Sequence, residues 1–154
     1  MTASHDIRPI TAAETRPLRH AILRPDQAIE ECVYPTDDAP DTLHAGAFLD
    51  SKFVGIASVA REQFPDEPHL NAWRLRGMAT VAEVRRMGYG AALVRACIAH
   101  VAAQSGNLLW CNGRTSAREF YETLGFRTHG DEYESPAGTG PHHIFRREVS
   151  PEEK

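Results

Sequence analysis

Apolar and polar positions divide the first third of the chain into short elements. Residues 6–10 predict a strand, and Thr11 followed by Glu14 has the spacing of a capping box that opens a helix. Residues 31–41 are rich in proline and aspartate, which break regular structure and favour turns. We expect this segment to be a loop at the rim of an active site.

The middle of the chain has the period of two that is typical of strands. Apolar residues 44–49 and 53–59 flank Asp50-Ser51-Lys52, which predicts a β-hairpin. Residues 73–81 predict a further strand with strict alternation. One face would carry Trp73, Leu75, Gly77, Ala79 and Val81, and the other Arg74, Arg76, Met78 and Thr80.

The next segment predicts a helix followed by a buried strand. Apolar residues recur at helical spacing over residues 91–104, and Gly106 supplies a C-terminal stop. The wholly apolar residues 108–111 are typical of a buried central strand. We expect Trp73 and Trp110 in the core, because both lie in predicted buried strands.

The last segment completes the order of elements. Ser116 and Glu119 form a second capping-box pattern, and Gly125 ends the helix that it opens. A strand, a Gly/Pro turn over residues 136–141 and a final strand from His142 follow. This order predicts an α+β fold in which all 154 residues form a single domain. Its central sheet would be mixed and mostly antiparallel, with flanking helices.

Composition sets the size and charge of the protein. Of the 154 residues, 42% are hydrophobic and 25% charged, enough for one compact domain with a core. Seventeen Lys and Arg against 21 Asp and Glu give a formal charge of -4. This charge argues against nucleic acid or an anionic membrane as a partner, so any phosphate-binding site must be local.

The cysteines and the N-terminal segment exclude other classes of protein. Cys32, Cys97 and Cys111 lack the spacing of a disulfide framework or a zinc site. We therefore expect reduced thiols, no metal and a cytoplasmic location. The first ten residues contain no apolar run, so we expect neither a signal peptide nor a membrane anchor.

A Gly-rich loop joins the strand at 73–81 to the helix that follows. It reads Arg85-Arg86-Met87-Gly88-Tyr89-Gly90. Such a turn is an anion site, because the free N–H groups of the first helical turn point outward and the helix dipole favours negative charge. The two glycines let a phosphate approach the backbone closely, and the two arginines can pair with its oxygens. Taken alone, the segment could also be an ordinary turn with solvated arginines.

Two other nucleotide-binding motifs fail on spacing. A P-loop needs GxxxxGK[ST], and the chain contains neither Gly-Lys-Ser nor Gly-Lys-Thr. A Rossmann fingerprint needs GxGxxG with an acidic residue about 20 residues further on, where this chain has Gln104-Ser105.

Two blocks of sequence resemble the GNAT superfamily of N-acetyltransferases. The first is Leu75-Arg76-Gly77-Met78-Ala79-Thr80 with the Gly-rich loop, which together resemble the family's central R/QxxGxG/A motif. The second is Asn112, Ala117 and Phe120-Tyr121-Glu122-Thr123-Leu124-Gly125-Phe126, which resemble its N…A…FYExLGF segment. A small bacterial branch labelled ElaA-like or YjcF-like is similar at Leu18-Arg19-His20, Asp37-Asp38 and Gly140-Pro141-His142-His143.

The resemblance implies acetyl-CoA as co-substrate and a role for each matching residue. The strand before the loop would bulge and pair with the pantetheine arm at Met78, Ala79 and Thr80. The pyrophosphate would lie on the backbone amides of Arg86, Met87, Gly88, Tyr89, Gly90 and Ala91, beside the Arg85 side chain. Asn112 would reach the pantetheine, and Tyr121 would protonate the leaving thiolate. A backbone N–H near Met78 would hold the oxyanion.

The general base and the acceptor stay open. Many family members carry a glutamate on the strand before the loop, but this strand has two arginines and no carboxylate. The candidates are His142, His143, Glu31, Asp37 and Asp38. Acidic residues in the segment 31–41 would favour a cationic amine, unless they are merely solvated.

These inferences predict an N-acetyltransferase that passes the acetyl group directly to a primary amine in a ternary complex. The acceptor would be a small molecule or a peptide, and the protein a monomer or a homodimer. Two alternatives remain: a catalytically silent acyl-CoA sensor or regulatory domain, and an interaction module whose loop binds no nucleotide.

Overall fold

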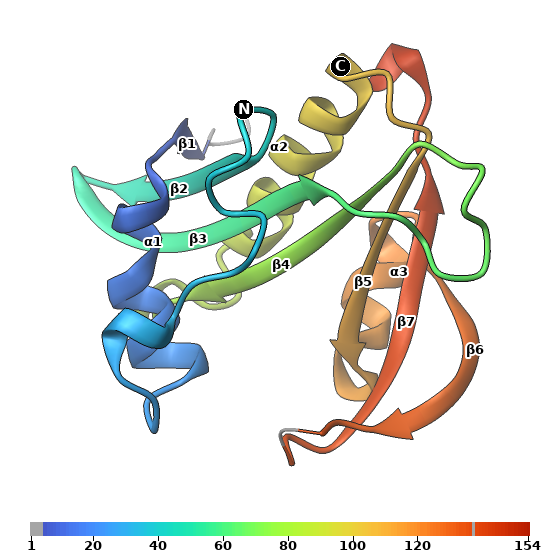
Figure 1. The fold of residues 1–154 in the computed structure, drawn as a ribbon. Coiled ribbons are helices and arrows are strands. Elements are labelled where there is room, and N and C mark those ends of the chain that lie inside the picture. The colour runs from blue at the N-terminus through green and yellow to red at the C-terminus, as the bar shows by residue number, and fades with distance from the viewer. Residues whose placement is uncertain (1–4, 137) are drawn as a thin grey trace.

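The computed structural model describes residues 5–136 and 138–154 and contains one seven-stranded sheet flanked by helices (Figure 1). The strands are β1 (Asp6–Pro9), β2 (Leu43–Leu49), β3 (Lys52–Arg61), β4 (Ala72–Thr80), β5 (Leu108–Arg114), β6 (Arg127–Glu134) and β7 (Pro141–Glu148). The helices are α1 (Ala12–Leu18), α2 (Tyr89–Ala103) and α3 (Arg118–Thr123). The strand order is β1-β2-β3-β4-β5-β7-β6, and β4–β5 is the one parallel pair among these strands. The predicted α+β class and mixed, mostly antiparallel sheet are confirmed.

The first helix begins where its local signal lies. The Thr11 hydroxyl accepts a hydrogen bond from the Glu14 N–H over 3.2 Å, and the Glu14 carboxylate accepts one from the Thr11 N–H over 2.8 Å. This capping box satisfies two donors at the start of α1, as predicted. Pro17 lies inside α1, and the chain continues as a wider π-helical turn over Arg19–Leu23.

The predicted hairpin is formed by β2 and β3. Its turn consists of Asp50 and Ser51, with φ of 50° and 67°, and Lys52 already belongs to β3. Left-handed backbone at both central residues is typical of a type I′ turn, whose twist matches that of the flanking strands. The loop therefore has two residues rather than the three that the apolar pattern left between the strands.

A bulge interrupts β4. Gly77 and Met78 together lie opposite one residue of β3, and Gly77 has φ of 62°. Such a bulge bends the strand and reverses its alternation. Met78 packs against the main core instead of sharing a face with the arginines. The strict alternation predicted for this strand therefore holds as far as Arg76 and is wrong beyond it.

Helices cover the two faces of the sheet unequally. In Figure 1, α2 and α3 lie behind the sheet and α1 lies in front of β2 and β3. The main core between the sheet and α2 and α3 includes Trp73, Leu93, Val101, Leu109 and Phe145. On the opposite face a smaller cluster gathers Phe64, Ala72, Leu108 and Trp110. Both tryptophans are buried, as predicted.

The predicted signals at the ends of α2 and α3 hold in part. Ser116 does not cap α3, because it lies within a 3₁₀ turn, Thr115–Ala117, from which the helix continues without a side-chain cap. α2 does end before Gly106, whose N–H donates to the Val101 carbonyl over 2.8 Å, but the residue with the left-handed backbone is Ser105, with φ of 62°. Gly125 does end α3 in the left-handed conformation, with φ of 88°.

The remaining expectations on the fold concern thiols, the last turn and membrane helices. All three cysteines are buried free thiols. The predicted turn over residues 136–141 includes residue 137, which lies outside the described residues. Within the described ranges, no helix has the length and hydrophobicity needed to cross a membrane.

Candidate active site

The Gly-rich loop turns the chain from β4 into α2. Arg86 and Gly88 both have left-handed backbones, with φ of 67° and 84°. Gly88 is the N-cap of α2, and the first bond of the helix runs from the Ala92 N–H to the Gly88 carbonyl over 3.0 Å. The N–H groups of residues 89–91 therefore have no acceptor within the helix. They form a site for an anion at the positive end of α2.

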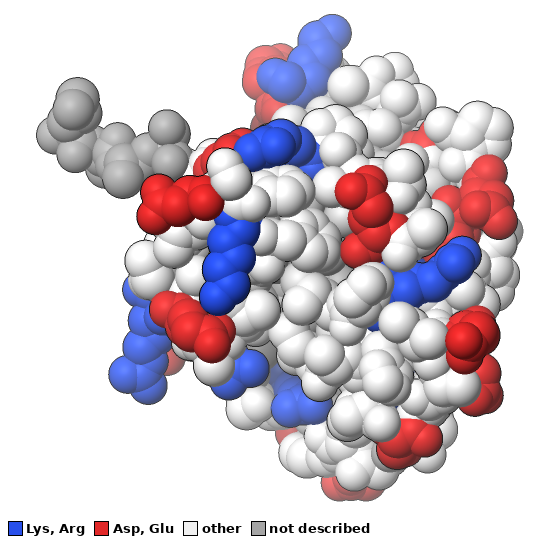
Figure 2. Space-filling model, turned by 90° about the vertical axis from the view of Figure 1, so that its left-hand side faces the viewer, with Lys and Arg blue, Asp and Glu red and all other residues white. Residues whose placement is uncertain are grey.

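The side chains of the loop leave this site open. Arg85 and Arg86 are exposed and make no ion pair within the part of the chain that the structure describes. Tyr89 is buried in the main core and offers the site only its backbone. A Cβ on Gly90 would meet Phe120 no closer than 3.5 Å, so the surface above Gly90 is unobstructed. On the face drawn in Figure 2, acidic and basic side chains are mixed around a largely uncharged centre.

The edge of β4 beside the loop is unpaired. β4 and β5 pair at three positions, the last being Arg74 with Trp110, and then diverge (Figure 1). From Leu75 onward, the edge of β4 that faces β5 has no ladder partner among the described strands. Met78, the second residue of the bulge, lies on this edge together with Ala79 and Thr80. An unpaired edge can bind an extended ligand as an added strand, so the residues present fit a pantetheine arm.

Tyr121 is held on α3 by aromatic packing. Its ring stacks on Phe145 with centroids 4.5 Å apart and contacts Phe120 and Phe126 edge-on. The side chain is buried, and its hydroxyl interacts with the thiol of Cys111. Burial first, and then Cys111, raise the pKa of Tyr121 above its usual value. The phenol is therefore kept protonated, the state in which it can donate a proton.

Asn112 and the two candidate histidines lie on β5 and β7. The Asn112 side chain is exposed, and its Oδ1 accepts a hydrogen bond of 2.6 Å from the Tyr133 hydroxyl. His142 Nδ1 lies 2.9 Å from the Gly140 carbonyl, and His143 Nδ1 lies 2.9 Å from the Thr115 hydroxyl. Neighbouring residues of a strand point to opposite faces, so the two histidines serve different faces of the sheet.

The carboxylate candidates for the base have other partners or lie exposed. Glu31 accepts a hydrogen bond from the Ala28 N–H over 3.1 Å, and Asp38 is exposed. Asp37 is buried and forms a bidentate ion pair with Arg19, with N–O distances of 2.7 and 3.0 Å. Burial alone would raise the pKa of Asp37, but the hydrogen bonds from Arg19 and a backbone N–H outweigh it and lower the pKa. Asp37 is thus a structural anion.

The family follows from sequence comparison. Residues 11–137 match the family model described as an acetyltransferase (GNAT) domain. The chain belongs to the GNAT family. It is also 36% identical over 141 residues to the N-acetyltransferase YitI of Bacillus subtilis (strain 168), covering 91% of this chain and 93% of YitI. Membership makes the protein an acetyl-CoA-dependent acyltransferase.

Solved structures of GNAT proteins share the fold. Escherichia coli ElaA has a TM-score of 0.73 at 15% identity, covering 94% of this chain and 99% of ElaA. An aminoglycoside 6′-N-acetyltransferase complexed with coenzyme A has a TM-score of 0.72 at 15% identity, covering 95% of this chain and 98% of that one. At these identities the likeness concerns the fold, and the ElaA-like or YjcF-like branch stays a prediction.

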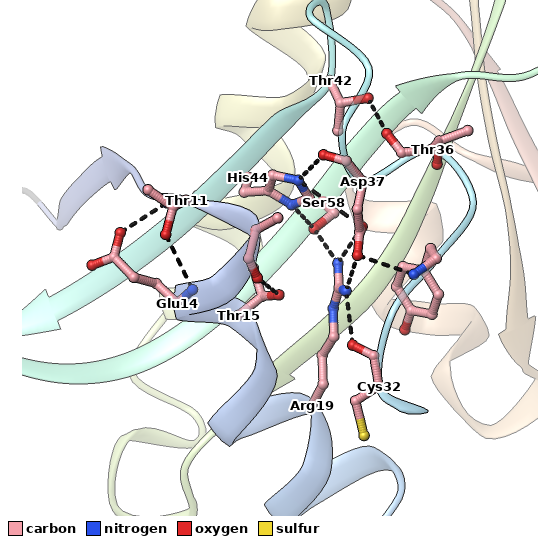
Figure 3. Close-up of polar contacts among 12 residues, drawn as sticks. Thr11, Glu14, Thr15, Arg19, Cys32, Thr36, Asp37, Thr42, His44 and Ser58 are labelled. Atoms are coloured by element: carbon pink, nitrogen blue, oxygen red, sulfur yellow. Dashed lines mark hydrogen bonds and ion pairs between the residues drawn. The ribbon is translucent and has the colours of Figure 1, made fainter. Parts of the chain in front are cut away.

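A buried polar network beside the GNAT site was not foreseen from the sequence (Figure 3). Besides Asp37, Arg19 donates to Ser58 over 3.0 Å and to the Cys32 carbonyl over 3.2 Å. His44 joins the network through Ser58, with Nδ1 to Oγ at 2.7 Å. No local spacing in the sequence connects Arg19 with Asp37 or Ser58, which are 18 and 39 positions away.

Two further residues reach the site from a distance in sequence. Nε2 of His5 donates to the Met87 carbonyl over 2.7 Å, and its ring meets Tyr89 edge-on at 4.6 Å. On the other side, the Tyr34 hydroxyl lies 3.0 Å from the position that a Cβ on Gly77 would take. His5 therefore supports the loop and Tyr34 borders the bulge, although neither carried a recognisable motif.

A separate hollow lies away from these groups. Its volume is about 400 Å³, and it is lined by Arg95, Ile98, Thr123, Leu124, Arg147 and Glu153. None of these residues belongs to the Gly-rich loop or to the unpaired edge of β4. We therefore assign this hollow no part in the transfer reaction.

Proposed function

We propose that this GNAT protein transfers an acetyl group from acetyl-CoA directly to a primary amine while both substrates are bound. The observation that carries the proposal is the unpaired edge of β4 leading into the free N–H groups of α2. The thioester of acetyl-CoA supplies the activated acetyl group. The chain supplies binding, orientation and proton transfer.

Binding is assigned to the backbone of two adjoining segments. The N–H groups of Arg86, Gly88, Tyr89, Gly90 and Ala91 bind the pyrophosphate, with the Arg85 side chain beside them. The Met87 N–H, which was expected among them, donates to the Val84 carbonyl over 3.2 Å. Met78, Ala79 and Thr80 pair with the pantetheine, and Asn112 reaches it from β5. The fit rests on the left-handed backbone at Gly88, the open surface at Gly90 and the missing ladder bonds of β4.

Two groups act on the developing charges. A backbone N–H at the bulge near Met78 stabilises the oxyanion, because a fixed dipole in a water-poor site needs no reorganisation during the reaction. The Tyr121 phenol gives its proton to the departing thiolate. Its raised pKa makes phenolate formation costly, so the transfer depends on the basicity of that thiolate.

His142 is the general base that the arrangement favours. Its Nδ1 donates to the Gly140 carbonyl, which leaves the lone pair of Nε2 for the amine proton or a bridging water. His142 pairs with Arg114 of β5, which lies four residues beyond Trp110. On β4, Met78 likewise lies four residues beyond Arg74, which pairs with Trp110. Counted along the strands, His142 is therefore about level with the bulge, across the gap where β4 and β5 diverge. Asp37, by contrast, is committed to its ion pair.

Direct transfer is supported by the state of the thiols. An acyl-enzyme intermediate would require a reactive thiolate. Burial raises the pKa of Cys97 to about 12 and that of Cys111 to about 12. Cys32 is buried as well. A covalent acetyl-cysteine is thus disfavoured, and a ternary complex is the simpler route.

The test is a broad screen of primary amines with acetyl-CoA, in which released thiol and acetylated product are both measured. We expect release that depends on a particular amine and a matching product mass. Binding of acetyl-CoA without transfer to any amine would favour a silent acyl-CoA sensor. Absence of binding at millimolar acetyl-CoA would contradict the proposal and favour an interaction module.

Other properties of the protein are proposed on the same footing. One domain spans the whole chain, of which residues 11–137 match the family model. The cytoplasmic location, the monomeric or homodimeric state, and the absence of a metal, nucleic acid or membrane partner stay predictions.

A further inference from the structure

One guanidinium beside the bulge lacks a partner. Arg76 is half-buried on β4, and it makes no hydrogen bond or ion pair within residues 5–136 and 138–154. Its contact is with the ring of Tyr34, 4.0 Å from the centroid. The neighbouring arginines differ, because Arg19 is paired with Asp37 and Arg74 with Glu62 over 2.9 Å.

The surroundings of Arg76 disfavour an isolated cation. Burial lowers the pKa of Arg76 most, and the like charge of Arg74 lowers it further. Three guanidiniums and two carboxylates gather here, which leaves one positive charge unbalanced. A half-buried charge without a partner is unfavourable, and an incoming oxyanion would compensate it with charge-assisted hydrogen bonds.

The position of Arg76 relates this charge to the reaction. Arg76 lines a narrow cleft together with Arg74, Tyr34, Thr36 and Ser58, among others. Arg76 immediately precedes the bulge at Gly77 and Met78, where the oxyanion donor is proposed. An anionic group bound by Arg76 would therefore hold the rest of its molecule beside the transferred acetyl group.

We propose that the acceptor is a primary amine that also carries an oxyanion, either carboxylate or phosphate, and that Arg76 binds this oxyanion. The inference rests on the proposed function and names its substrate class. It replaces the cationic amine suggested by the acidic residues of segment 31–41, because the carboxylate of Asp37 forms an ion pair with Arg19. A guanidinium binds carboxylate and phosphate through the same bidentate geometry, so both sources are kept.

Kinetics with matched acceptors test the inference. Amino acids are compared with their carboxamides, and phosphoethanolamine with ethanolamine, on the wild type, Arg76→Gln and Arg76→Lys. We expect Arg76→Gln to lower kcat/KM for the anionic member by about 10- to 100-fold and for its neutral match by less than about threefold. Arg76→Lys should recover part of the loss. Arg127→Gln, on the outer edge of the sheet, is the matched control.

A binding experiment decides the case independently of turnover. The CoA-loaded wild type and Arg76→Gln are titrated with N-acetyl amino acids and with inorganic phosphate by isothermal titration calorimetry, and the guanidinium NMR signal of Arg76 locates the site in the wild type. We expect carboxylate or phosphate to bind the wild type at least about tenfold more tightly than Arg76→Gln. No binding to the wild type, or equal affinity for both proteins, would overturn the inference. Anion binding without acetyl transfer to any amine would instead contradict the proposed function and leave the anion site established.

Discussion

The two sides of β4 are built from different kinds of atoms. Toward α2 and the Gly-rich loop, the site consists of backbone N–H and C=O groups on an unpaired edge and a free helix end. Toward α1, it consists of side chains, namely Arg19, Asp37, Ser58, Tyr34 and Arg76. A backbone site can bind the same ligand while side chains vary, whereas a side-chain site changes with each substitution. We therefore propose that acetyl-CoA binds on the first side and that the second side selects the acceptor.

Substitutions on the two sides of β4 should also have different effects. Adding a side chain blocks the backbone site and leaves the fold intact, because the open surface at Gly90 has room in the protein alone. Removing a side chain from the buried network leaves a charge without its partner, which destabilises the whole domain. The variants Tyr121→Phe, Arg19→Met and Gly90→Val separate loss of chemistry, loss of stability and loss of binding.

The largest effect is expected from Tyr121→Phe. The change keeps the stacking on Phe145 but removes the proton for the thiolate, so kcat should fall by about 10²- to 10⁴-fold. Acetyl-CoA affinity and melting temperature should stay near those of the wild type. Single-turnover kinetics measure the chemical step. A loss below about threefold there would remove Tyr121 from the catalytic residues.

Arg19→Met should have the next largest effect, and on stability. It leaves Asp37 buried and unpaired, which costs about 3–5 kcal/mol in the free energy of unfolding. Urea denaturation measures the loss, with Arg127→Gln as a control that breaks an exposed ion pair and should change little. Equal losses in both variants would mean that the buried pair has no special role.

Gly90→Val should weaken the binding of acetyl-CoA by roughly 100-fold, because the valine side chain blocks approach to the N–H groups that bind the pyrophosphate. Isothermal titration calorimetry gives the affinity. Ala96→Val introduces the same side chain further along α2 and serves as the control for helix propensity. Normal binding by Gly90→Val would place the pyrophosphate elsewhere.

The smallest effect concerns pH. The pKa of Asp37 is lower in the folded protein than in the unfolded chain. As the pH falls, the unfolded chain therefore takes up this proton first, and stability drops below about pH 4. Asp37→Asn removes the titrating group, so its unfolding free energy should vary less with pH over that range. Parallel pH profiles for both proteins would contradict the assigned ion pair.

The backbone side could largely be predicted from the sequence, because its signals are local. The hairpin, the helix after the Gly-rich loop and the strand before it follow from spacing within a few residues. The bulge at Gly77 was implied by the family resemblance, and simple alternation missed it. The cap predicted at Ser116 is wrong because this residue lies in a 3₁₀ turn that precedes α3.

The side-chain side could not be predicted, because its contacts join distant segments. Arg19 meets Asp37 and Ser58 across 18 and 39 positions of sequence. No local pattern indicates that the arginine next to Leu18 is 1% exposed, or that Arg76 forms no ion pair with any described residue. Only the strand register and the path of the loop over residues 31–41 bring these groups together.

The most direct test of the account is an NMR titration of ¹⁵N-labelled protein with acetyl-CoA. The largest shifts of amide signals are expected at residues 86–91 and along β4 from Leu75 to Thr80, with smaller changes at Arg19 and Asp37. That pattern would support a substrate bound by backbone groups on one side of β4. Absence of binding, or shifts concentrated in α1 and residues 31–41, would contradict binding by these backbone groups.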